Sequence, residues 1–357
     1  MEMNKLISTV LPLILAVLLL LPAVQPVSAS APPAGWSSGT ISGAYRIYGI
    51  WGVPPPGTPN LYAVGQTANG SNHGGIFNYD GSAWTSIDIS VINPSKYNYY
   101  GVWGTGYNDV WAVGQGGIIS HRGETMWSNV PWSMAVSPLN AVWGVDHSNV
   151  YAVGNGIIHY DGTTWSVVTT GLTDSPIFKA IWGSSANDIF AVGSVGSYPT
   201  SSGVIAHWNG TAWSYMTVPA IAGLNAVWGS ASNDVYAVIN TAAPNFLHWD
   251  GSSWTNISSS VYGGTDGFDA IWGNSSSNIY AAGSGIAHFD GTNWSRVYPP
   301  SGYTGGELAM GSTGSIIVVG GYTSSVIYFS PSTDATLSSL GVSSGTLVPV
   351  FGSANTS

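Results

Sequence analysis

The sequence predicts an all-β fold built from repeated four-stranded units, and three observations lead to this prediction. The composition combines 48 Gly, 17 Trp and 19 Tyr with only 6% charged residues, where ordinary soluble domains carry about 25%. Helix-forming residues are scarce beyond the N-terminus, and short runs of Val, Ile, Tyr and Trp alternate with Gly and Asn, as in strands joined by tight turns. The third observation is internal repetition.

Two sequence blocks recur along the chain. The first contains Trp-Gly and is represented by "VWGSASNDVYAV" at 227–238, with further copies beginning at 102, 142, 181 and 271. The second is represented by "HYDGTTW" at 159–165, with related segments at 78–84, 120–127, 207–213, 248–254 and 288–294. A catalytic constellation is built once per chain, whereas a structural device can recur. The density of polar residues in the second block is therefore interpreted as structural, and no catalytic residue is assigned.

Each unit divides into four strand-like pieces. In the unit that starts near Asn140 they are "NAVWG", "VYAVG", "IIHYDG" and "TWSVVTT". Four strands repeated at about 40 residues are typical of a β-propeller blade. A weaker seventh copy at 310–321 lacks the tryptophan of the fourth strand, and "AGWSSGTIS" from Ala34 resembles that missing strand. The sequence therefore predicts a seven-bladed β-propeller of four-stranded blades, the last closed by the N-terminal strand, with six or eight blades as alternatives.

The local chemistry of the repeats explains most of their polar residues. The Asp-Gly pair is expected at a hairpin turn, with Asp capping its own backbone and Gly supplying a positive φ. Asn209 and Arg122 replace the aspartate in two copies. The tryptophan that follows is expected to begin the outer strand and cover the seam between blades. The Asn and Asp residues at 108–109, 187–188 and 233–234 are expected to bond the backbone of a turn of constant length.

One histidine recurs in most units and could suggest a metal site. The column consists of His159, His207, His248 and His288. Equivalent positions in neighbouring blades lie ~10 Å or more apart, which exceeds the reach of one metal ion. We expect a structural column, with neither metal nor cofactor. Asp266 and Asp269 could also hold Ca²⁺, although two carboxylates in a Gly-rich loop are more often a solvated turn.

The first 31 residues resemble a secretory signal peptide. Lys5 precedes an apolar run, and small residues stand at 29–31, where a signal peptidase would cut. The run is shorter than the ~20 residues of a spanning helix, and an uncleaved anchor is the alternative. Cleavage removes Glu2 and Lys5 together, so the net charge stays at −10. We therefore expect a secreted or cell-surface protein, without membrane insertion after cleavage, that does not bind nucleic acid.

The repeats resemble a known group of proteins. Their Trp-Gly and Asp-Gly-x-x-Trp blocks resemble those of secreted bacterial and archaeal β-propeller proteins and, more remotely, Asp-box (BNR) propellers of the sialidase and photosystem II assembly factor type. The resemblance covers about residues 36–330 and implies the fold rather than an activity. It departs from the Asp-box pattern because Asp161 and Gly162 are adjacent. A sialidase would also require three clustered arginines, whereas Arg122 and Arg296 fall in different units.

The C-terminal segment adds a second resemblance. "DATLSSLGVSSGTLVPVF", from Asp334, resembles the opening of a cadherin-like β-sandwich domain of bacterial surface proteins. Some twenty residues cannot bury a sandwich core, so we expect a fragment of a longer gene product, with an unstructured tail as the alternative. The predicted domains are the signal peptide (1–31), the β-propeller (32–332), and a linker with the incomplete start of the sandwich domain (333–357).

Three classes of function remain open. We favour a surface binding or adhesion module for an extracellular glycan or protein, because the fold accounts for the motifs. A glycan-active hydrolase or lyase is the second class, and its candidate acids are Asp174, Asp266, Asp269, Glu307 and Glu124. A structural or assembly-factor propeller without a small-molecule ligand is the third.

The predicted binding surface is the end of the ring that bears the second-to-third strand loops and the blade-to-blade connections. The loops at this end vary in length, and insertions confined to one face of a repeat ring usually mark the binding face. Aromatic side chains suited to stacking on sugars or holding a peptide gather in these loops. The candidate ligand-binding residues are Tyr97, Tyr99, Tyr100, Trp132, Tyr198, Tyr262, Tyr303 and Tyr322.

Overall fold

The structure is a computed structural model, and the description covers part of the chain. The described residues are 36–53, 60–68, 73–80, 83–133, 135–196, 201–241, 246–257, 267–297, 310–312, 317–320 and 325–329. Residues 1–31 and 32–357 form two separate units, and every described strand belongs to the second. Among the described residues, none forms a helix with the length and hydropathy needed to cross a membrane.

Six sheets are each built from four consecutive antiparallel strands, which we number as blades 1 to 6. Blade 1 comprises β2 (Ala44–Val53), β3 (Asn60–Thr67), β4 (Gly74–Tyr79) and β5 (Trp84–Ser86). Blade 2 comprises β6 (Tyr99–Gly106), β7 (Asp109–Gly114), β8 (Ile119–Arg122) and β9 (Trp127–Asn129), with a 3₁₀ turn, η1 (Gln115–Gly117), between its second and third strands. Blade 3 comprises β10 (Leu139–Asp146), β11 (Asn149–Gly154), β12 (Ile157–Tyr160) and β13 (Trp165–Val167).

The next three blades repeat this plan. Blade 4 comprises β14 (Ile177–Ser185), β15 (Asp188–Val195), β16 (Ser202–Trp208) and β17 (Trp213–Tyr215). Blade 5 comprises β18 (Leu224–Ala231), β19 (Asp234–Ile239), β20 (Phe246–Trp249) and β21 (Trp254–Asn256). Blade 6 comprises β22 (Phe268–Ser275), β23 (Asn278–Gly283), β24 (Ile286–Phe289) and β25 (Trp294–Val297).

The remaining strands form a composite sheet from the two ends of the propeller sequence. It has the order β1-β28-β27-β26, with β1 (Trp36–Thr40), β26 (Met310–Ser312), β27 (Ile317–Gly320) and β28 (Ser325–Phe329). Trp36 lies opposite Phe329 and Thr40 opposite Ser325. This register confirms the predicted pairing of the N-terminal strand with the strand that ends at residue 329.

The predicted number of seven blades is corrected to six. Only six sheets consist of four consecutive strands of the repeat. The composite sheet takes three short strands from residues 310–329 and its outer strand from the N-terminal side. The physical reason lies in its sequence, where Met310-Gly311 replaces Trp-Gly and no tryptophan follows to begin an outer strand. The all-β class and the propeller arrangement agree with the prediction.

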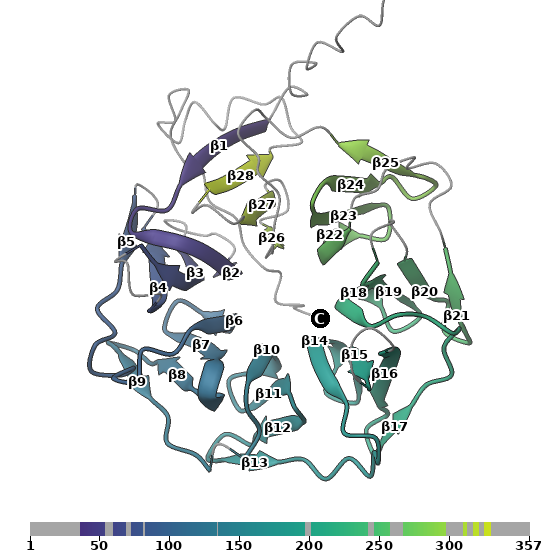
Figure 1. The fold of residues 1–357 in the computed structure, drawn as a ribbon, viewed down its shortest axis with the longest axis horizontal. Coiled ribbons are helices and arrows are strands. Elements are labelled where there is room, and N and C mark those ends of the chain that lie inside the picture. The colour runs from purple at the N-terminus through teal and green to yellow at the C-terminus, as the bar shows by residue number, and fades with distance from the viewer. Residues whose placement is uncertain are drawn as a thin grey trace, which may run out of the picture. The chain divides into compact units, whose positions relative to one another are not determined.

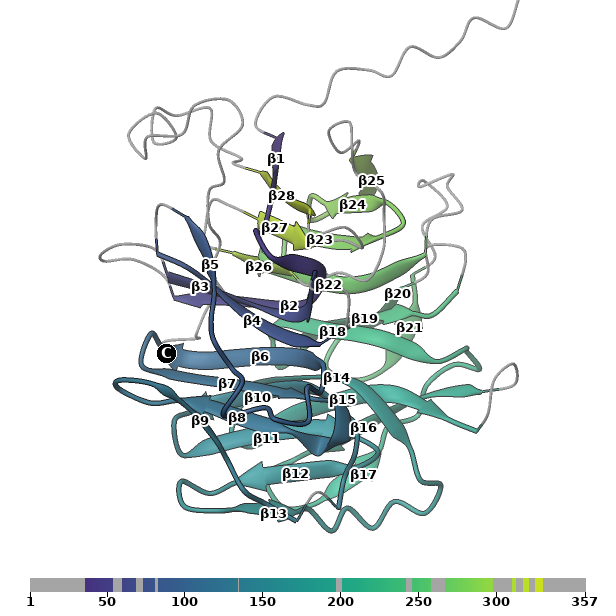
Figure 2. The ribbon, with the colours of Figure 1, turned by 60° about the vertical axis from the view of Figure 1, so that its left-hand side comes forward.

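The first strands of the six blades lie side by side in chain order, and β26 of the composite sheet lies between those of blades 6 and 1. These contacts run in order from β2 through β6, β10, β14, β18 and β22 to β26, which contacts β2 again. Figure 1 shows these inner strands around the centre, with the outer strands at the rim. Figure 2 shows the four strands of a blade layered one beyond the next, most clearly in β10–β13. The inner strands therefore form a closed ring, as in a β-propeller.

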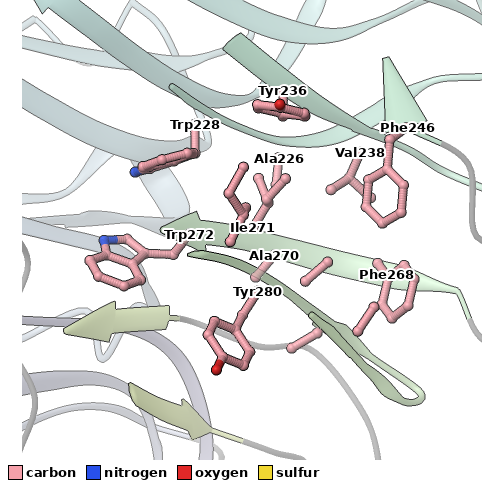
Figure 3. Close-up of a cluster of buried hydrophobic side chains, with 14 of the residues drawn as sticks. Ala226, Trp228, Tyr236, Val238, Phe246, Phe268, Ala270, Ile271, Trp272 and Tyr280 are labelled. Atoms are coloured by element: carbon pink, nitrogen blue, oxygen red, sulfur yellow. The ribbon is translucent and has the colours of Figure 1, made fainter. Parts of the chain in front are cut away.

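Aromatic side chains fill the seams between blades. The tryptophan that begins an outer strand packs on an aromatic residue of the preceding blade, as in Trp165 on Trp111 (ring centroids 5.4 Å apart) and Trp254 on Phe190 (6.1 Å). Figure 3 shows the seam between blades 5 and 6, where Phe246 and Val238 lie in one cluster with Phe268 and Ala270. The predicted role of the outer tryptophans is confirmed, and burial of these large rings supplies much of the favourable free energy of folding.

The Trp-Gly pair explains how closely the inner strands approach. A Cβ atom placed at Gly144 of blade 3 would lie 2.6 Å from Cη2 of Trp103 in blade 2. The same contact, at 2.6–2.9 Å, joins each preceding tryptophan to Gly104, Gly183, Gly229 and Gly273. Each indole therefore lies on the glycine of the next blade, where any side chain would collide with it. This ladder sets the spacing of the inner strands and the position of their ends.

Candidate functional site

The blades present two chemically different ends, which we name by their loops. The turn face carries the hairpins that join the first strand to the second and the third to the fourth in each blade. The connection face carries the second-to-third strand loops and the blade-to-blade connections. The registers place Asp109 and Arg122 at the first end of blade 2, and Tyr99 and Gly114 at the second. The Trp-to-glycine contacts join equivalent positions, so all six blades point the same way.

On the turn face, the Asp-Gly segments form the predicted hairpins. In blade 3, Oδ1 of Asp161 accepts hydrogen bonds from the backbone N–H groups of Thr163 and Thr164, both at 2.9 Å. Gly162 has a φ of 90°, which glycine adopts without strain. Asn209 in blade 4 accepts the equivalent two bonds. The carboxylate charge is therefore not required, and "HYDGTTW" is confirmed as a turn.

The histidines belong to a hydrogen-bonded ladder on the same face. In blade 5, Nε2 of His248 lies 2.8 Å from Oδ1 of Asp234, whose Oδ2 accepts a hydrogen bond of 2.5 Å from Ser230. Blades 2 and 4 have the same arrangement, and asparagine replaces aspartate in blades 3 and 6. The imidazole never lies between the hydroxyl and the carboxylate, so the order differs from that of a nucleophilic triad. Recurrence in five blades favours a structural role.

This ladder corrects one detail of the sequence-based prediction. Asp109, Asp188 and Asp234 were expected to bond the backbone of their turns, but each accepts hydrogen bonds from a histidine and a hydroxyl side chain instead. The reason is their position at the first residue of the second strand, where the side chain points toward the third. Burial opposes ionisation of Asp109, yet the bonds from His121 and Thr105 lower the pKa of this carboxyl below its usual value.

Each histidine also stacks on an aromatic residue of the neighbouring strand. The ring centroids lie 4.2 Å apart for His159 and Tyr151, and 4.3 Å apart for His288 and Tyr280. Burial lowers the pKa of His159 and of His288 below the usual histidine value, because the imidazolium is poorly solvated there. Among the described residues, no group of three or more His, Asp or Glu side chains could hold a metal ion.

The connection face has a feature that the sequence analysis did not identify. The first strand of every blade contains a β-bulge one residue before the Ala/Gly-Val/Ile-Trp segment. In blade 3, Leu139 pairs with Gly154 and Ala141 with Val153, so Asn140 is left out of the ladder. The equivalent bulge positions in the six blades are Tyr48, Tyr100, Asn140, Lys179, Asn225 and Asp269. We call these residues the bulge ring.

The bulge ring surrounds one end of the inner strands, and its members contact neighbouring blades. Tyr48 and Tyr100 lie edge to face with centroids 5.3 Å apart. Nδ2 of Asn140 donates to the backbone oxygen of Phe178 in blade 4 at 2.7 Å. Nδ2 of Asn225 donates to Oδ1 of Asp269 in blade 6 at 2.9 Å. Bulges commonly re-aim side chains beside functional sites, and here they place six side chains of four kinds at one end of the ring.

Variation within the repeat could have identified these positions from the sequence. The residues after the bulge are nearly constant, as in "GIWG", "GVWG", "AVWG" and "AIWG". The bulge residue itself changes from tyrosine to asparagine, lysine and aspartate. A position that a fold requires tends to stay constant within a repeat, so variation between constant neighbours indicates a position that is free to serve recognition.

The structure describes four of the eight predicted ligand residues. Tyr97 packs over Gly116, where a Cβ would lie 2.5 Å from its ring, and Nε1 of Trp132 donates to the backbone oxygen of Gly117 at 2.7 Å. These two aromatic residues therefore flank η1, and both are half-buried. Tyr100 belongs to the bulge ring. The predicted residues Tyr198, Tyr262, Tyr303 and Tyr322 lie outside the described residues.

Tyr99 differs from its neighbours because it is fully buried. Its hydroxyl lies 2.7 Å from the hydroxyl of Ser120, and burial raises its pKa to about 12. Tyr99 therefore packs in the core beneath the connection face and holds the backbone from which Tyr100 extends.

Charge divides unequally between the two faces. Among the described residues, the turn face carries the carboxylates Asp80, Asp109, Glu124, Asp146, Asp161, Asp188, Asp234, Asp250 and Asp290, with the cation Arg122. The connection face carries the carboxylates Asp88, Asp174 and Asp269 and the cations Arg46, Lys96 and Lys179. The remaining described cation, Arg296, lies between the two faces on the outer strand β25, opposite Ala287. The turn face is therefore strongly acidic, whereas the described charges of the connection face balance.

The candidate acids of the predicted hydrolase or lyase are distributed over both faces. Glu124 lies exposed on the turn face. On the connection face, Asp174 lies in the connection between blades 3 and 4, and Asp269 lies in blade 6. Asp266 and Glu307 lie outside the described residues, as does half of the predicted Asp266–Asp269 calcium pair. The described candidates are not brought together as a pair of acids.

Comparison with known proteins shows the fold. No known family and no curated protein matches the chain. The solved structure of YCF48 bound to D1 peptide is similar over 87% of this chain and 100% of its own, with 14% identity and a TM-score of 0.64. YCF48 from Cyanidioschyzon merolae is similar over 84% of this chain and 99% of its own, with 14% identity and a TM-score of 0.62.

A third solved structure is an enzyme. A catalytically inactive variant of virginiamycin B lyase from Staphylococcus aureus, with quinupristin, is similar over 83% of this chain and 98% of its own. Its identity is 11% and its TM-score is 0.66. The predicted remote resemblance to propellers of the photosystem II assembly factor type is thus supported in the fold. At these identities none of the three shows the activity or ligand of this chain.

Proposed function

We propose that this protein is a binding module that recognises an extracellular glycan or protein through its connection face. The observation that carries the proposal is the bulge ring, where six equivalent backbone positions present four kinds of side chain directly before a nearly constant segment. The proposal includes secretion through the N-terminal 31 residues and a role at the cell surface.

The described geometry supports this assignment by accounting for the turn face in structural terms. The aspartates of the hairpins are bound to backbone N–H groups, and the histidines are bound to Asp or Asn and stacked on aromatic rings. The connection face instead combines half-buried aromatic residues with amides and with both signs of charge. Aromatic faces surrounded by polar groups suit stacking on sugars and contact with peptides.

Within the proposal, the residues that contact ligand are Tyr97, Tyr100 and Trp132 together with Tyr48 of the bulge ring. Tyr198, Tyr262, Tyr303 and Tyr322 remain candidates from the sequence. The solved structure of YCF48 was determined with a bound D1 peptide. The binding screen therefore includes protein partners as well as glycans. We assign no functional residue of this chain from its similarity to the lyase.

The test is a binding screen of the secreted chain against an array of glycans and a panel of extracellular proteins. The variants are Tyr48→Ala with Tyr100→Ala, and separately Tyr97→Ala. Tyr107→Ala is the matched control, because Tyr107 is a half-exposed tyrosine on the turn face. We expect ligands found with the unaltered chain to be lost in the first two variants and retained in the control.

Two results would overturn the proposal. Loss of binding in Tyr107→Ala with retention in the other variants would place the site on the turn face. Absence of any ligand in both panels would favour a structural propeller. Thermal melting of every variant keeps unfolding separate from loss of a contact.

A further inference from the structure

The bulge ring contains one cation, Lys179 of blade 4. Its side chain is exposed, and no hydrogen bond or ion pair joins its ammonium group to a described residue. The two other cations of the connection face lie elsewhere, Arg46 at the start of β2 and Lys96 in the connection between blades 1 and 2. Lys179 is thus the only positive charge among the six bulge positions.

The backbone that carries Lys179 is held firmly. Phe178, the preceding residue, is fully buried, and its backbone oxygen accepts the 2.7 Å hydrogen bond from Asn140 of blade 3. On either side of the bulge, Phe178 pairs with Gly193 and Ala180 pairs with Val192 of β15. A charge on a fixed backbone loses less conformational entropy on binding than one on a mobile loop. Lys179 is therefore prepared to hold a ligand group at a defined place.

Among the described residues, charge opposes an anionic ligand less at the connection face than at the turn face. The net charge is −10, and nine of the described carboxylates lie on the turn face. An approaching anion is repelled there, whereas the described charges of the connection face balance. Electrostatic attraction and repulsion of this kind select the encounter surface.

The other members of the bulge ring indicate the rest of the ligand. Two are phenols, two are carboxamides and one is a carboxylate, and none is aliphatic. Peptides that dock as amphipathic helices need an apolar groove, and none of these six positions has an aliphatic side chain to line one. Phenol rings and planar amides suit the faces and hydroxyl groups of sugars.

We propose that the ligand of the connection face is an acidic oligosaccharide that bears carboxylate groups, with one carboxylate bound by Lys179. The sugar hydroxyls lie against Asn140 and Asn225, and a ring packs at Tyr48 and Tyr100. This inference rests on the proposed binding function and adds the chemical class of the ligand. The interaction is non-covalent, a charge-assisted hydrogen bond of the kind that contributes most to polar recognition.

The experiment measures binding of the full chain to three probes at low and moderate ionic strength. The probes are oligogalacturonate, the uncharged glucan oligomer maltoheptaose, and an oligoglutamate peptide of similar charge. The variants are Lys179→Gln and, as a matched control, Lys96→Gln, which removes an exposed cation from the same face. We expect oligogalacturonate to bind best, to weaken as salt rises, and to lose about tenfold or more in affinity in Lys179→Gln only.

The other outcomes separate the two proposals. Equal binding of maltoheptaose, or equal affinity of Lys179→Gln and the unaltered chain, would refute the acidic ligand while leaving a glycan-binding module in place. Preference for oligoglutamate would assign the site to an acidic peptide and refute the glycan. If none of the probes binds and the wider screen also finds no ligand, the proposed binding function fails together with this inference.

Discussion

Adding one methyl group at Gly144 tests the packing that positions both faces of the ring. In Gly144→Ala the new Cβ would lie 2.6 Å from Cη2 and 2.7 Å from Cζ3 of Trp103, and 2.9 Å from the backbone oxygen of Asn149. The last atom cannot easily retreat, because the backbone of Asn149 begins β11 and is paired with Asp146, and its side-chain Oδ1 lies 2.7 Å from Nε2 of His159. Overpacking of this kind costs about 1–3 kcal/mol. We expect the free energy of unfolding to fall by that amount and the Tm to fall by several degrees.

The assay is urea unfolding followed by tryptophan fluorescence and far-ultraviolet circular dichroism. Gly106→Ala is the matched control, because a Cβ at Gly106 in the preceding blade meets no atom within 4 Å. Trp103→Phe combined with Gly144→Ala completes a double-mutant cycle, in which the shorter ring should reduce the cost of the new methyl by about 1 kcal/mol. If Gly144→Ala and Gly106→Ala unfold at the same urea concentration, the proposed ladder of indole on glycine does not set the spacing of the strands.

Three further predictions concern the ends of the ring. Burial lowers the folded-state pKa of His159 and His288, so their contribution to stability is present above about pH 6.5 and is lost as the pH falls below it. Chemical unfolding between pH 7.5 and 5 should show this loss. If His159→Gln does not change the slope of the unfolding free energy against pH, the prediction is contradicted. Removing residues 36–40 exposes the edge of β28 that pairs with β1 and leaves β27 as its only partner. This deletion should lower stability by roughly 2–5 kcal/mol, whereas an unchanged Tm in calorimetry would exclude the closure. Asp161→Asn should change the free energy of unfolding by less than about 1 kcal/mol. Gly162→Ala should cost about 1–2 kcal/mol, because the φ of residue 162 is 90°. Equal melting curves for these two variants would show that the turn does not need glycine.

Turn chemistry was predictable from the sequence because it is local. The Asp-Gly hairpin needs only an acceptor side chain and a residue with positive φ, and Asp161 and Gly162 supply both within two positions. The recurrence of the turn gave the unit length and therefore the four-stranded blades. The same recurrence predicted a structural role for His159, but its hydrogen-bond partner Asn149, ten residues away, was not predicted.

Features that depend on pairing between strands were missed. A bulge is defined by the registers of two strands, so Asn140 looks like any other residue of its strand until Leu139 and Ala141 are seen opposite Gly154 and Val153. The same effect explains Tyr99, which the sequence analysis grouped with the loop tyrosines. The bulge at Tyr100 sets the side-chain direction of the residue before it, and Tyr99 enters the core.

The number of blades could not be predicted from local sequence patterns either. A weak seventh copy could be read at 310–321, but the strands there are short, and their sheet is completed only by β1 from the other end of the propeller sequence. Counting repeats in the sequence cannot distinguish a blade of consecutive strands from a composite sheet.

We propose that the turn face is structural and that recognition occurs at the connection face. Hydrogen–deuterium exchange of the full chain, with and without a ligand from the screen, tests it directly. We expect slower exchange in peptides that contain residues 46–48, 97–100 and 177–179, with no change in peptides that contain 145–149 or 161–164. Protection of the turn segments 145–149 and 161–164, with none at the bulge ring, would contradict it.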